Sequence, residues 1–385
     1  MSTQTAYRIQ AVDASTFRAT GDKNSPNGRK SHDPPLKFPE YAPGWDQSEK
    51  FEPYKQFKFE EPGKRADKTL PNLFAKGLPT NDKKYLVPSE QLQKYGYSVD
   101  DLTPKFGSEV RGVQLSKLSD KAKDELAYYV AERGVVVFRD QDFRELPIKD
   151  ALKYAEHFGR QHIHPTSGSP QDYPEVHLIF REEGDDIYQE YFSKNLSSVA
   201  WHSDVTYEKQ PPGTTFLGIL EMPRTGGDTL FSDNTEAYNR LSPEFKKRLE
   251  GLKAVHSAHE QADASIQRGG VVRREPVQNI HPIVRKHPAT GKKSIFVNPQ
   301  FTRNIVGLKQ EESDLILNFL YEIIAKGSDF HVRARWEDGS VVVWDNRRTS
   351  HTALLDWSDG ARRHAYRYTP QAEVPFENEE GENDD

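Results

Sequence analysis

Short runs of β-branched and aromatic residues, separated by polar loops, are the feature that most constrains how this chain can fold. These runs have the length of β-strands, and they do not alternate with helices in the regular way that builds parallel βαβ units. We therefore expect a mainly β fold of the α+β class, in which a sandwich or barrel of short strands is flanked by helices. The expected strands are 135–139, 176–180, 215–220, 229–232, 294–298, 340–345 and 365–369.

Helical spacing of apolar residues is confined to a few segments. The first begins after Ser119, a residue type that caps helix N-termini, and stops at Gly134, a residue type that commonly ends helices. The last is the most clearly amphipathic, with apolar residues on one face from Leu315 to Ile323. The expected helices are 119–134, 147–158, 242–251 and 310–326.

The first 85 residues differ in composition from the rest of the chain. They hold nine of the 25 prolines, and no helical or alternating pattern persists in them. The start has little apolar surface to bury and is expected to be disordered, whereas the aromatic side chains from Trp45 to Phe59 need burial. The expected division is a disordered tail at 1–35, an extended arm at 36–85 packed on the main domain, the main domain at 86–374, and an acidic tail at 375–385.

Composition limits the chemistry and the partners of this chain. It has no cysteine, so disulfides and thiolate chemistry are excluded and any metal is held by histidine and carboxylate side chains. A net charge of -6 without a basic stripe argues against nucleic acid as a partner. No apolar run approaches the roughly 20 residues that a membrane helix needs, and no secretory pattern is visible. A cytoplasmic location without membrane contact is the default expectation.

His202 and Asp204 are separated by one residue in the tetrapeptide that begins at Trp201. In an extended strand, residues two apart point to the same side, so both could face one metal ion. Two histidines and a carboxylate on one face of an octahedron leave the other face open for a chelating cosubstrate and dioxygen. His351, far along the chain, is the candidate third ligand. With 13 histidines and 59 acidic residues a His-x-Asp pair also arises by chance, so the case depends on the rest of the sequence.

Several ordered motifs around these residues make the sequence resemble the taurine/sulfonate dioxygenases and their relatives that act on phenoxyacetate herbicides and alkyl sulfates. The resemblance implies a double-stranded β-helix, or jelly roll, which agrees with the short strands expected above. The N-terminal arm is similar to that of the fungal α-ketoglutarate-dependent sulfonate dioxygenases. The motifs are Phe158-Gly159, His162-Ile163-His164-Pro165, Trp201-His202-Ser203-Asp204-Val205-Thr206, Gly226-Gly227-Asp228-Thr229, Phe296-Val297-Asn298 with Phe301, Trp344-Asp345-Asn346-Arg347 leading to His351, and Arg362-Arg363 with Arg367.

The resemblance implies that His202, Asp204 and His351 hold iron(II), and that 2-oxoglutarate and dioxygen are cosubstrates. Thr229 matches the threonine that hydrogen-bonds 2-oxoglutarate, and Arg363 matches the arginine that pairs with its distal carboxylate. A guanidinium suits this role because it grips a carboxylate with two parallel hydrogen bonds. The family chemistry splits dioxygen, releases CO2 and succinate, and removes hydrogen from the substrate.

Two interpretations concern neighbours of these residues. Arg362 adjoins Arg363, and an alignment shifted by one residue would exchange them, although strand alternation points them to opposite sides. Asp345 is expected to orient the backbone or an arginine behind the site. The remaining histidines without a partner pattern are interpreted as structural or surface residues: His157, His162, His177, His256, His259, His281, His287, His331 and His364.

The resemblance also implies an anion site for the substrate. In the sulfonate branch, a histidine of the His-Pro motif and an arginine four positions after the cosubstrate arginine hold the substrate anion, and here these positions are His164 and Arg367. Phe301 matches an aromatic residue of the pocket wall. Ser167 and Ser198 stand where the taurine enzymes have a tyrosine and an asparagine around the amine of taurine. We therefore expect an organosulfonate other than taurine, hydroxylated beside sulfur and then split into sulfite and an aldehyde.

Three alternatives stay open. The same chemistry could act on an alkyl sulfate ester or on an aryloxy or alkyl carboxylate, since arginine and histidine hold those anions too. An inactive jelly roll could serve as a binding module, but it would not need the complete set of metal and cosubstrate residues. A metal-dependent hydrolase would leave Arg363 without a role. The sequence also leaves open whether the chain forms a homo-oligomer.

Overall fold

The computed structural model describes His32 and residues 34–44, 46, 48–69, 72, 74, 97–185 and 187–378. Most of the predicted 1–35 tail, Trp45, and the end of the acidic tail from 379 onward lie outside the described residues.

Seven strands form the largest sheet. In spatial order they are β1 (Ser98–Asp101), β2 (Ser108–Arg111), β3 (Val135–Phe138), β13 (Val341–Asp345), β5 (Thr214–Glu221), β15 (Arg363–Tyr368) and β4 (Val176–Arg181). Neighbouring strands are antiparallel except β2 and β3, which run parallel.

Three smaller sheets complete the strands of the described residues. Their members, in spatial order, are β12 (His331–Ala334), β6 (Thr229–Asp233) and β14 (Thr349–Ala353) in one, β11 (Thr302–Ile305), β7 (Lys253–Ser257) and β8 (Gln278–Pro282) in another, and the pair β10 (Lys293–Ile295) and β9 (Val284–Lys286). The first of these sheets faces the large sheet across a shared apolar core. The predicted jelly roll of mainly β structure with flanking helices is confirmed.

Strand alternation divides the large sheet into two faces. On β4, Val176 and Leu178 pack in the core under the helices, whereas Ile179 packs in the core between the two sheets. On β15, Tyr366 belongs to the first core and Ala365 to the second. The odd-numbered residues of both strands therefore point into the jelly roll, which decides which side chains can reach a site inside it.

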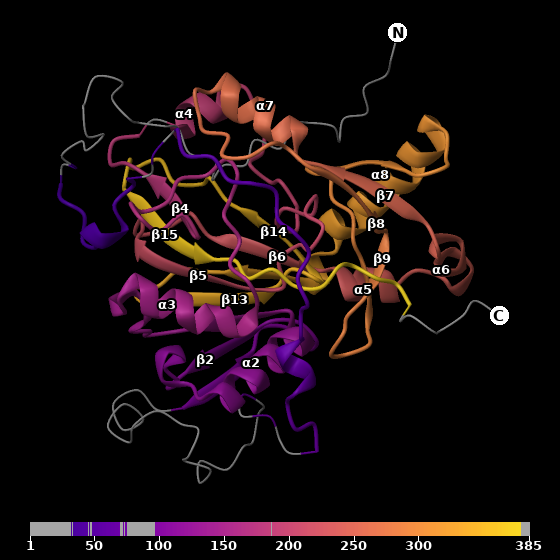
Figure 1. Ribbon diagram of the computed structural model, residues 1–385, viewed down its shortest axis with the longest axis horizontal. Coiled ribbons are helices and arrows are strands. Elements are labelled where there is room, and N and C mark those ends of the chain that lie inside the picture. The colour runs from indigo at the N-terminus through magenta and orange to yellow at the C-terminus, as the bar shows by residue number, and fades with distance from the viewer. Residues whose placement is uncertain are drawn as a thin grey trace.

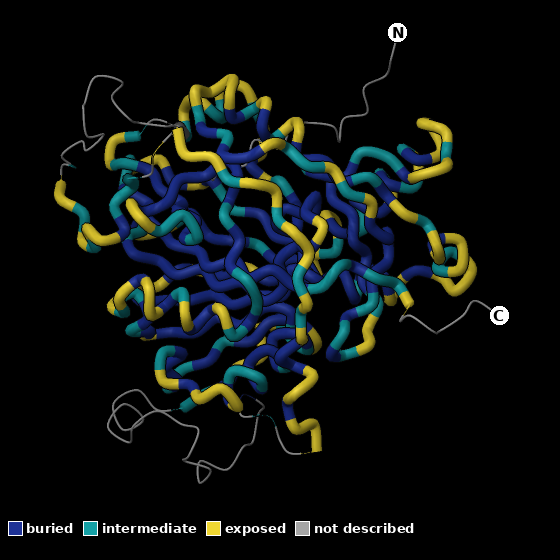
Figure 2. The backbone as a smooth tube through the Cα atoms, viewed as in Figure 1, coloured by how far each residue is buried: buried dark blue, intermediate teal, exposed yellow. Residues whose placement is uncertain are grey.

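Helices cover the outer side and one end of the strands. The helices are α2 (Asp120–Arg133), α3 (Ile148–Ala155), α4 (Ile187–Phe192), α5 (Asn234–Asn239), α6 (Pro243–Leu249), α7 (His259–Gln267) and α8 (Gln310–Lys326). Figure 1 shows α2 and α3 beside the large sheet and α8 with β7 and β8 at the far end. Figure 2 shows that the central strands are buried, while exposed residues gather on the outer helices and loops. No helix of the described segments is long and apolar enough to span a membrane.

The four predicted helices are confirmed, with small shifts at their ends. Ser119 caps α2 by accepting a hydrogen bond from the Ala122 N–H, and Gly134 ends it with a φ of 77°. Further elements escaped prediction because their residues are polar. The edge strand β1 reads Ser-Val-Asp-Asp, and β14 reads Thr-Ser-His-Thr-Ala although four of its five residues are buried.

The described part of the N-terminal segment lies against the main domain. Tyr41 is fully buried, and its hydroxyl lies 2.9 Å from that of Tyr368. The Phe57 N–H donates to Gln210 Oε1 at 2.8 Å. The indigo segment of Figure 1 then reaches α2, on which the single turn η3 (Pro62–Lys64) packs. These contacts support the proposed arm, whose limits remain a proposal.

Candidate functional site

Three buried side chains that could hold a metal lie beside the core between the two facing sheets. One ligand atom from each of His202, Asp204 and His351 lies within 4.8 Å of the others. Among the described residues, this is the group of histidine and carboxylate side chains that could hold a metal ion. Backbone hydrogen bonds bring the two histidines together, because the His202 N–H donates to the His351 carbonyl at 3.0 Å and the reverse bond is 2.7 Å. Strand β14 carries His351, so a strand of the small sheet positions the ligand most distant in sequence.

The histidine ring nitrogens are directed at the carboxylate of Asp204. His202 Nε2 lies 3.9 Å from Asp204 Oδ1, and His351 Nε2 lies 3.6 Å from the same oxygen. His202 Nδ1 lies 2.8 Å from the Ala200 carbonyl, to which it can only donate. The proton of the neutral ring is then on Nδ1, which leaves the lone pair of Nε2 for a metal.

The extended strand predicted for His202 and Asp204 is wrong. His202 forms a single β-bridge and Asp204 begins a turn, so the two are not neighbours on one face of a strand. The turn includes Val205 with a φ of 38°, a conformation that costs a β-branched residue free energy. The turn begins at Asp204 itself, and His202 and Asp204 still contribute ligand atoms to one cluster.

Positive charge surrounds Asp204. Arg367 Nη1 donates to Asp204 Oδ1 at 2.7 Å. Burial alone would raise the pKa of Asp204, but Arg367 and the two histidine ligands outweigh it and hold the pKa below its ordinary value. The other oxygen, Oδ2, is buried and has no hydrogen-bond partner in the part of the chain that the structure describes. An ionised carboxylate with an unused oxygen beside two imidazole nitrogens fits a divalent metal.

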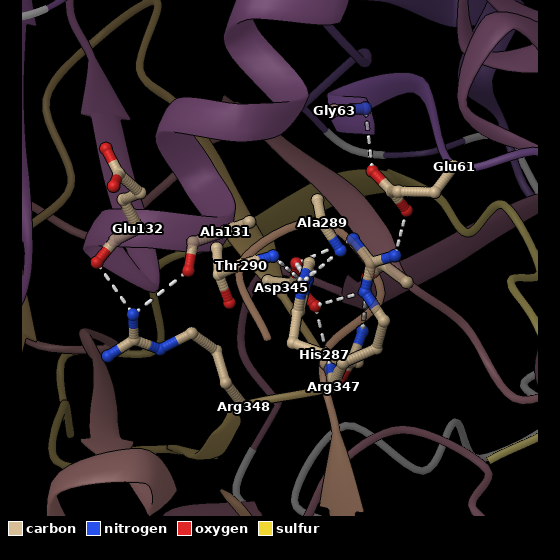
Figure 3. A network of polar contacts seen from close by, with 12 residues as sticks. Glu61, Gly63, Ala131, Glu132, His287, Ala289, Thr290, Asp345, Arg347 and Arg348 are labelled. Carbon is tan, nitrogen blue, oxygen red and sulfur yellow. Dashed lines mark hydrogen bonds and ion pairs between the residues drawn. The ribbon is translucent and has the colours of Figure 1, made fainter. Parts of the chain in front are cut away.

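A buried network lies behind this cluster at the β13–β14 turn, and Figure 3 shows the part of it around Asp345 and Arg347. The Asn346 side chain accepts from the Asp204 N–H at 3.0 Å. The adjacent Asp345 receives Nε of Arg347 at 2.8 Å and lies 2.9 Å from Nε2 of His287. Arg347 also pairs with Glu61 from the N-terminal segment. Asp345 therefore orients an arginine, as predicted, and the turn that holds Asn346 is fixed on both sides.

The Gly226-Gly227 turn delivers Thr229 to the start of β6. Gly227 has a φ of 70°, and an added Cβ would lie 3.2 Å from Nε of Arg363. Only glycine lets the backbone pass this close to the guanidinium, and the Gly227 carbonyl accepts from Arg363 Nη2 at 3.1 Å. The Thr229 hydroxyl is buried and has no hydrogen-bond partner among the described residues. A hydroxyl in this state is available to a ligand.

Arg362 and Arg363 point to opposite sides of β15. Arg362 lies 2.6 Å from Glu182 and 3.3 Å from Glu221, and it donates to the Pro34 and Pro35 carbonyls. It is thus engaged on the outer face. Arg363 is buried on the inner face with Arg367. This arrangement favours Arg363 as the cosubstrate arginine.

The two predicted anion-binding residues, Arg367 and His164, lie near each other. The Arg367 guanidinium lies over the Trp344 ring at 5.2 Å, and its Nε is buried and lacks a hydrogen-bond partner within the described segments. His164 is buried, and burial, His162 and Arg367 hold the pKa of His164 well below its ordinary value. Its Nδ1 accepts from the Thr166 N–H at 3.2 Å, so the proton of the neutral ring is on Nε2.

The other three predicted lining residues differ in their surroundings. Phe301 packs edge-on against His202, with ring centroids 6.3 Å apart, so it walls the metal cluster. Ser198 accepts a hydrogen bond from the Leu355 N–H at 3.1 Å, which ties its hydroxyl to the backbone. Ser167 is buried in the loop after His164.

Comparison with known proteins places the chain in a family. The sequence matches "Taurine catabolism dioxygenase TauD, TfdA family" over residues 98–369. The chain belongs to this family. Relatives of the chain include proteins named α-ketoglutarate-dependent dioxygenases, and α-ketoglutarate is another name for 2-oxoglutarate. The chain is a dioxygenase of this 2-oxoglutarate-dependent class.

Three proteins similar to this chain are informative. The "Alpha-ketoglutarate-dependent sulfonate dioxygenase" of Saccharomyces cerevisiae is 46% identical over 360 residues, which cover 92% of this chain and 84% of that protein. An "Alkylsulfatase" of Acinetobacter baylyi is 32% identical, covering 71% of this chain and 84% of the relative. The crystal structure of a putative α-ketoglutarate-dependent taurine dioxygenase from Burkholderia xenovorans is 30% identical with a TM-score of 0.61, covering 73% and 94% of the two chains.

Two inward-facing residues of the TauD, TfdA domain were missed by the sequence interpretation. Arg181 is the register partner of Arg363, and both guanidinium groups lie over the Trp357 ring, at 5.4 and 5.9 Å. His177 is the register partner of Arg367. The available signal was the presence of two polar residues, His177 and Arg181, four positions apart and therefore on one face of the otherwise apolar strand β4.

Proposed function

We propose that this chain is an iron(II)- and 2-oxoglutarate-dependent dioxygenase that hydroxylates an organosulfonate at the carbon beside sulfur. The observation that carries the proposal is the position of Arg367, whose guanidinium lies 2.7 Å from the Asp204 carboxylate of the metal cluster. A fixed cation beside the metal cluster would bind the anionic group of the substrate. The carbon atom that carries this group then lies within reach of the oxidising centre. The 46% sequence identity to a protein named sulfonate dioxygenase, over 92% of this chain, supports a sulfonate as the anion.

His202, Asp204 and His351 would hold iron(II) through two imidazole nitrogens and one carboxylate oxygen. Iron(II) with 2-oxoglutarate supplies the activation of dioxygen, at the expense of CO2 release and succinate formation. Arg363 would grip the distal carboxylate of 2-oxoglutarate, and the Thr229 hydroxyl would donate to it. Both groups are buried, so neither hydrogen bond competes with bulk water.

Arg367 and His164 would bind the substrate anion and exclude water from it. Arg367 provides charge, and the Nε2–H of neutral His164 provides a directed hydrogen bond. One oxygen atom of dioxygen enters succinate and the other becomes the hydroxyl group of the substrate. The carbon–sulfur bond of the hydroxylated sulfonate then breaks, its electron pair leaves with sulfite, and the hydroxyl loses its proton to give an aldehyde.

Taurine should be a poorer substrate than sulfonates without an amine. Ser167 and Ser198 replace the larger polar residues of the taurine enzymes, and the Ser198 hydroxyl is occupied by a backbone N–H. A protonated amine would lose its water without gaining a carboxylate or amide partner from these positions.

An alkyl sulfate ester is the second candidate, because a relative at 32% identity has the name alkylsulfatase. A panel of taurine, pentane-1-sulfonate, butyl sulfate and hexanoate, assayed for substrate-dependent succinate release, separates the candidates. We expect pentane-1-sulfonate to give the highest kcat/KM. Preference for butyl sulfate would select the alternative, and preference for hexanoate would refute the proposal. The cytoplasmic location also remains a proposal.

Two arginine variants, assayed with the same panel of substrates, test the role of Arg367. Arg367→Ala should lower the kcat/KM of every anion by about 100-fold, on the scale of a lost charged partner. Arg335→Ala removes an exposed arginine and should leave turnover unchanged. Unchanged turnover in the Arg367 variant would show that the anion binds elsewhere.

A further inference from the structure

His177 is a buried histidine with one ring nitrogen that no group of the described residues satisfies. It is 4% exposed, and its Nε2 is buried without a hydrogen-bond partner in the described residues. A buried ring nitrogen of this kind has lost its water and gained nothing in exchange, unless a ligand supplies the partner.

The direction of the His177 side chain follows from strand pairing. His177 on β4 and Arg367 on β15 are antiparallel register partners, so their side chains lie on the same face of the sheet. The neighbouring inward residues Ile179 and Ala365 confirm that this face lines the interior of the jelly roll. The ring of His177 also packs against that of His164, with centroids 4.5 Å apart. His177 therefore touches one proposed anion-binding residue and is paired with the other.

The surroundings of His177 carry positive charge. Arg273 is 1% exposed, donates to Ser169 Oγ at 3.0 Å, and has two further nitrogens, Nε and Nη1, that find no partner among the described residues. Its charge is close enough to act on His177. Burial, His164 and Arg367 mainly hold the pKa of His177 well below its ordinary value, with a smaller contribution from Arg273, so the ring is neutral at neutral pH.

We propose that His177 is a specificity-determining residue, the third hydrogen-bond donor of the substrate anion site, and that it selects an anion with three terminal oxygens over a carboxylate. This inference rests on the proposed function and deepens it. Arg367, His164 and His177 would offer three donors close together, because His177 is the register partner of Arg367 and its ring packs against that of His164. A sulfonate or sulfate group presents three oxygens in a tetrahedral arrangement, whereas a planar carboxylate presents two and would leave one donor unused.

A pair of variants tests the position of the donor. In His177→Gln the amide nitrogen falls near the place of Nε2, whereas in His177→Asn it falls one bond short, near Nδ1. Both substitutions are polar and similar in size, so a difference between them reports the reach of the donor and not the loss of the ring. His364→Asn is the matched control, because His364 is buried on the opposite face of β15 and bonds the Tyr41 carbonyl at 3.0 Å.

The measurement is calorimetric binding of pentane-1-sulfonate, butyl sulfate and hexanoate to the full chain loaded with iron(II) and 2-oxoglutarate, without oxygen. We expect the ratio of Kd for hexanoate to Kd for pentane-1-sulfonate to fall about tenfold in His177→Asn. The ratio should stay near the wild-type value in His177→Gln and His364→Asn. Comparison with butyl sulfate tells whether the three-oxygen group belongs to a sulfonate or a sulfate ester.

Different outcomes address different claims. A wild-type chain that prefers the sulfonate while His177→Asn keeps the same ratio overturns the role of His177 and leaves the proposed function standing. An equal fall of the ratio in His364→Asn overturns it as well, since the effect is then not local. A wild-type chain that prefers hexanoate overturns the proposed function and this inference together.

Discussion

Each metal-ligating residue has its own structural support at the residue scale. His202 is oriented by the Ala200 carbonyl, Asp204 by Asn346 and Arg367, and His351 by its place on β14. All of these supports are groups of the chain itself, and Phe231 and Trp344 of the core between the sheets pack against the His351 ring. The cluster is therefore preorganised for a metal and is not created by it.

Replacement of a ligand should remove the metal and spare the fold. We expect His202→Ala, Asp204→Ala and His351→Ala each to lower iron(II) affinity by more than about 100-fold, since second-layer partners of metal ligands alone account for 10–100-fold. Metal content after anaerobic loading, together with circular dichroism, checks this. Asp338→Ala, on the surface, is the control. Wild-type iron content in any ligand variant would remove that residue from the site.

The two adjacent arginines should respond differently to the same substitution. Arg363→Lys loses a bidentate contact to 2-oxoglutarate, which costs about 1.5–3 kcal/mol and raises its Kd about 10- to 150-fold. Arg362→Lys affects contacts on the outer face, the ion pairs with Glu182 and Glu221 among them, and should leave that Kd unchanged. Titration of 2-oxoglutarate into both variants decides the matter. The reverse pattern would mean that the register is off by one residue.

Residues with a distinctive chemistry could be predicted from the sequence, and residues defined only by pairing could not. The metal ligands are recognisable from motifs, and the structure brings them together. His177 and Arg181 carry no motif, and their inward direction depends on the alternation and register of β4 against β15. The turn that begins at Asp204 was also hidden, because a two-residue spacing fits both a strand and the approach to a turn.

At the scale of elements, prediction followed apolar content. Strands β3, β5 and β13 are rich in valine, leucine and phenylalanine and were predicted within about one residue, as expected for strands buried on both faces. Strand β14 was not predicted, because its buried residues are polar where it borders the metal cluster. Polarity at a functional site thus conceals a buried strand from sequence patterns.

The N-terminal segment should be anchored by one buried ion pair. Glu61→Gln removes the negative charge opposite Arg347, which keeps Asp345 as a partner, so we expect a loss of about 1–3 kcal/mol in the free energy of unfolding. Denaturant unfolding measures this loss, and hydrogen exchange should show weaker protection around residues 54–64. Glu60→Gln, at an exposed neighbouring position, should change stability by less than about 0.5 kcal/mol. Equal effects of the two variants would contradict the anchor.

A second buried pair should make stability depend on acidity. Burial raises the pKa of Glu208, but hydrogen bonds and charges of His162 and Arg274 outweigh it and lower the pKa from 4.5 to about 2. A lowered folded-state pKa stabilises the fold above pH 4.5, and this stabilisation is lost as pH falls towards 2. Glu208→Gln should therefore be less stable than wild type at neutral pH, and the difference should shrink across that window. A constant difference in denaturation experiments would argue against the pair.

At the scale of the whole molecule, the likeness to the yeast sulfonate dioxygenase extends beyond the family domain. The family match ends at residue 98 on the N-terminal side, but the yeast protein aligns with 92% of the chain, so part of the preceding segment is shared as well. That segment contributes Glu61 to the network behind the metal cluster and Tyr54 to the Ile163 backbone beside His164. We infer that the arm belongs to the catalytic unit and supports its pocket.

The central claim is that this metal cluster oxidises a sulfonate at the carbon beside sulfur. The most direct measurement is the yield of succinate and sulfite from pentane-1-sulfonate, with iron(II), limiting 2-oxoglutarate and dioxygen. We predict equal amounts of the two products from the wild-type chain and neither from Asp204→Ala. Substrate-dependent succinate without sulfite, or sulfite formation that persists in Asp204→Ala, would contradict the account.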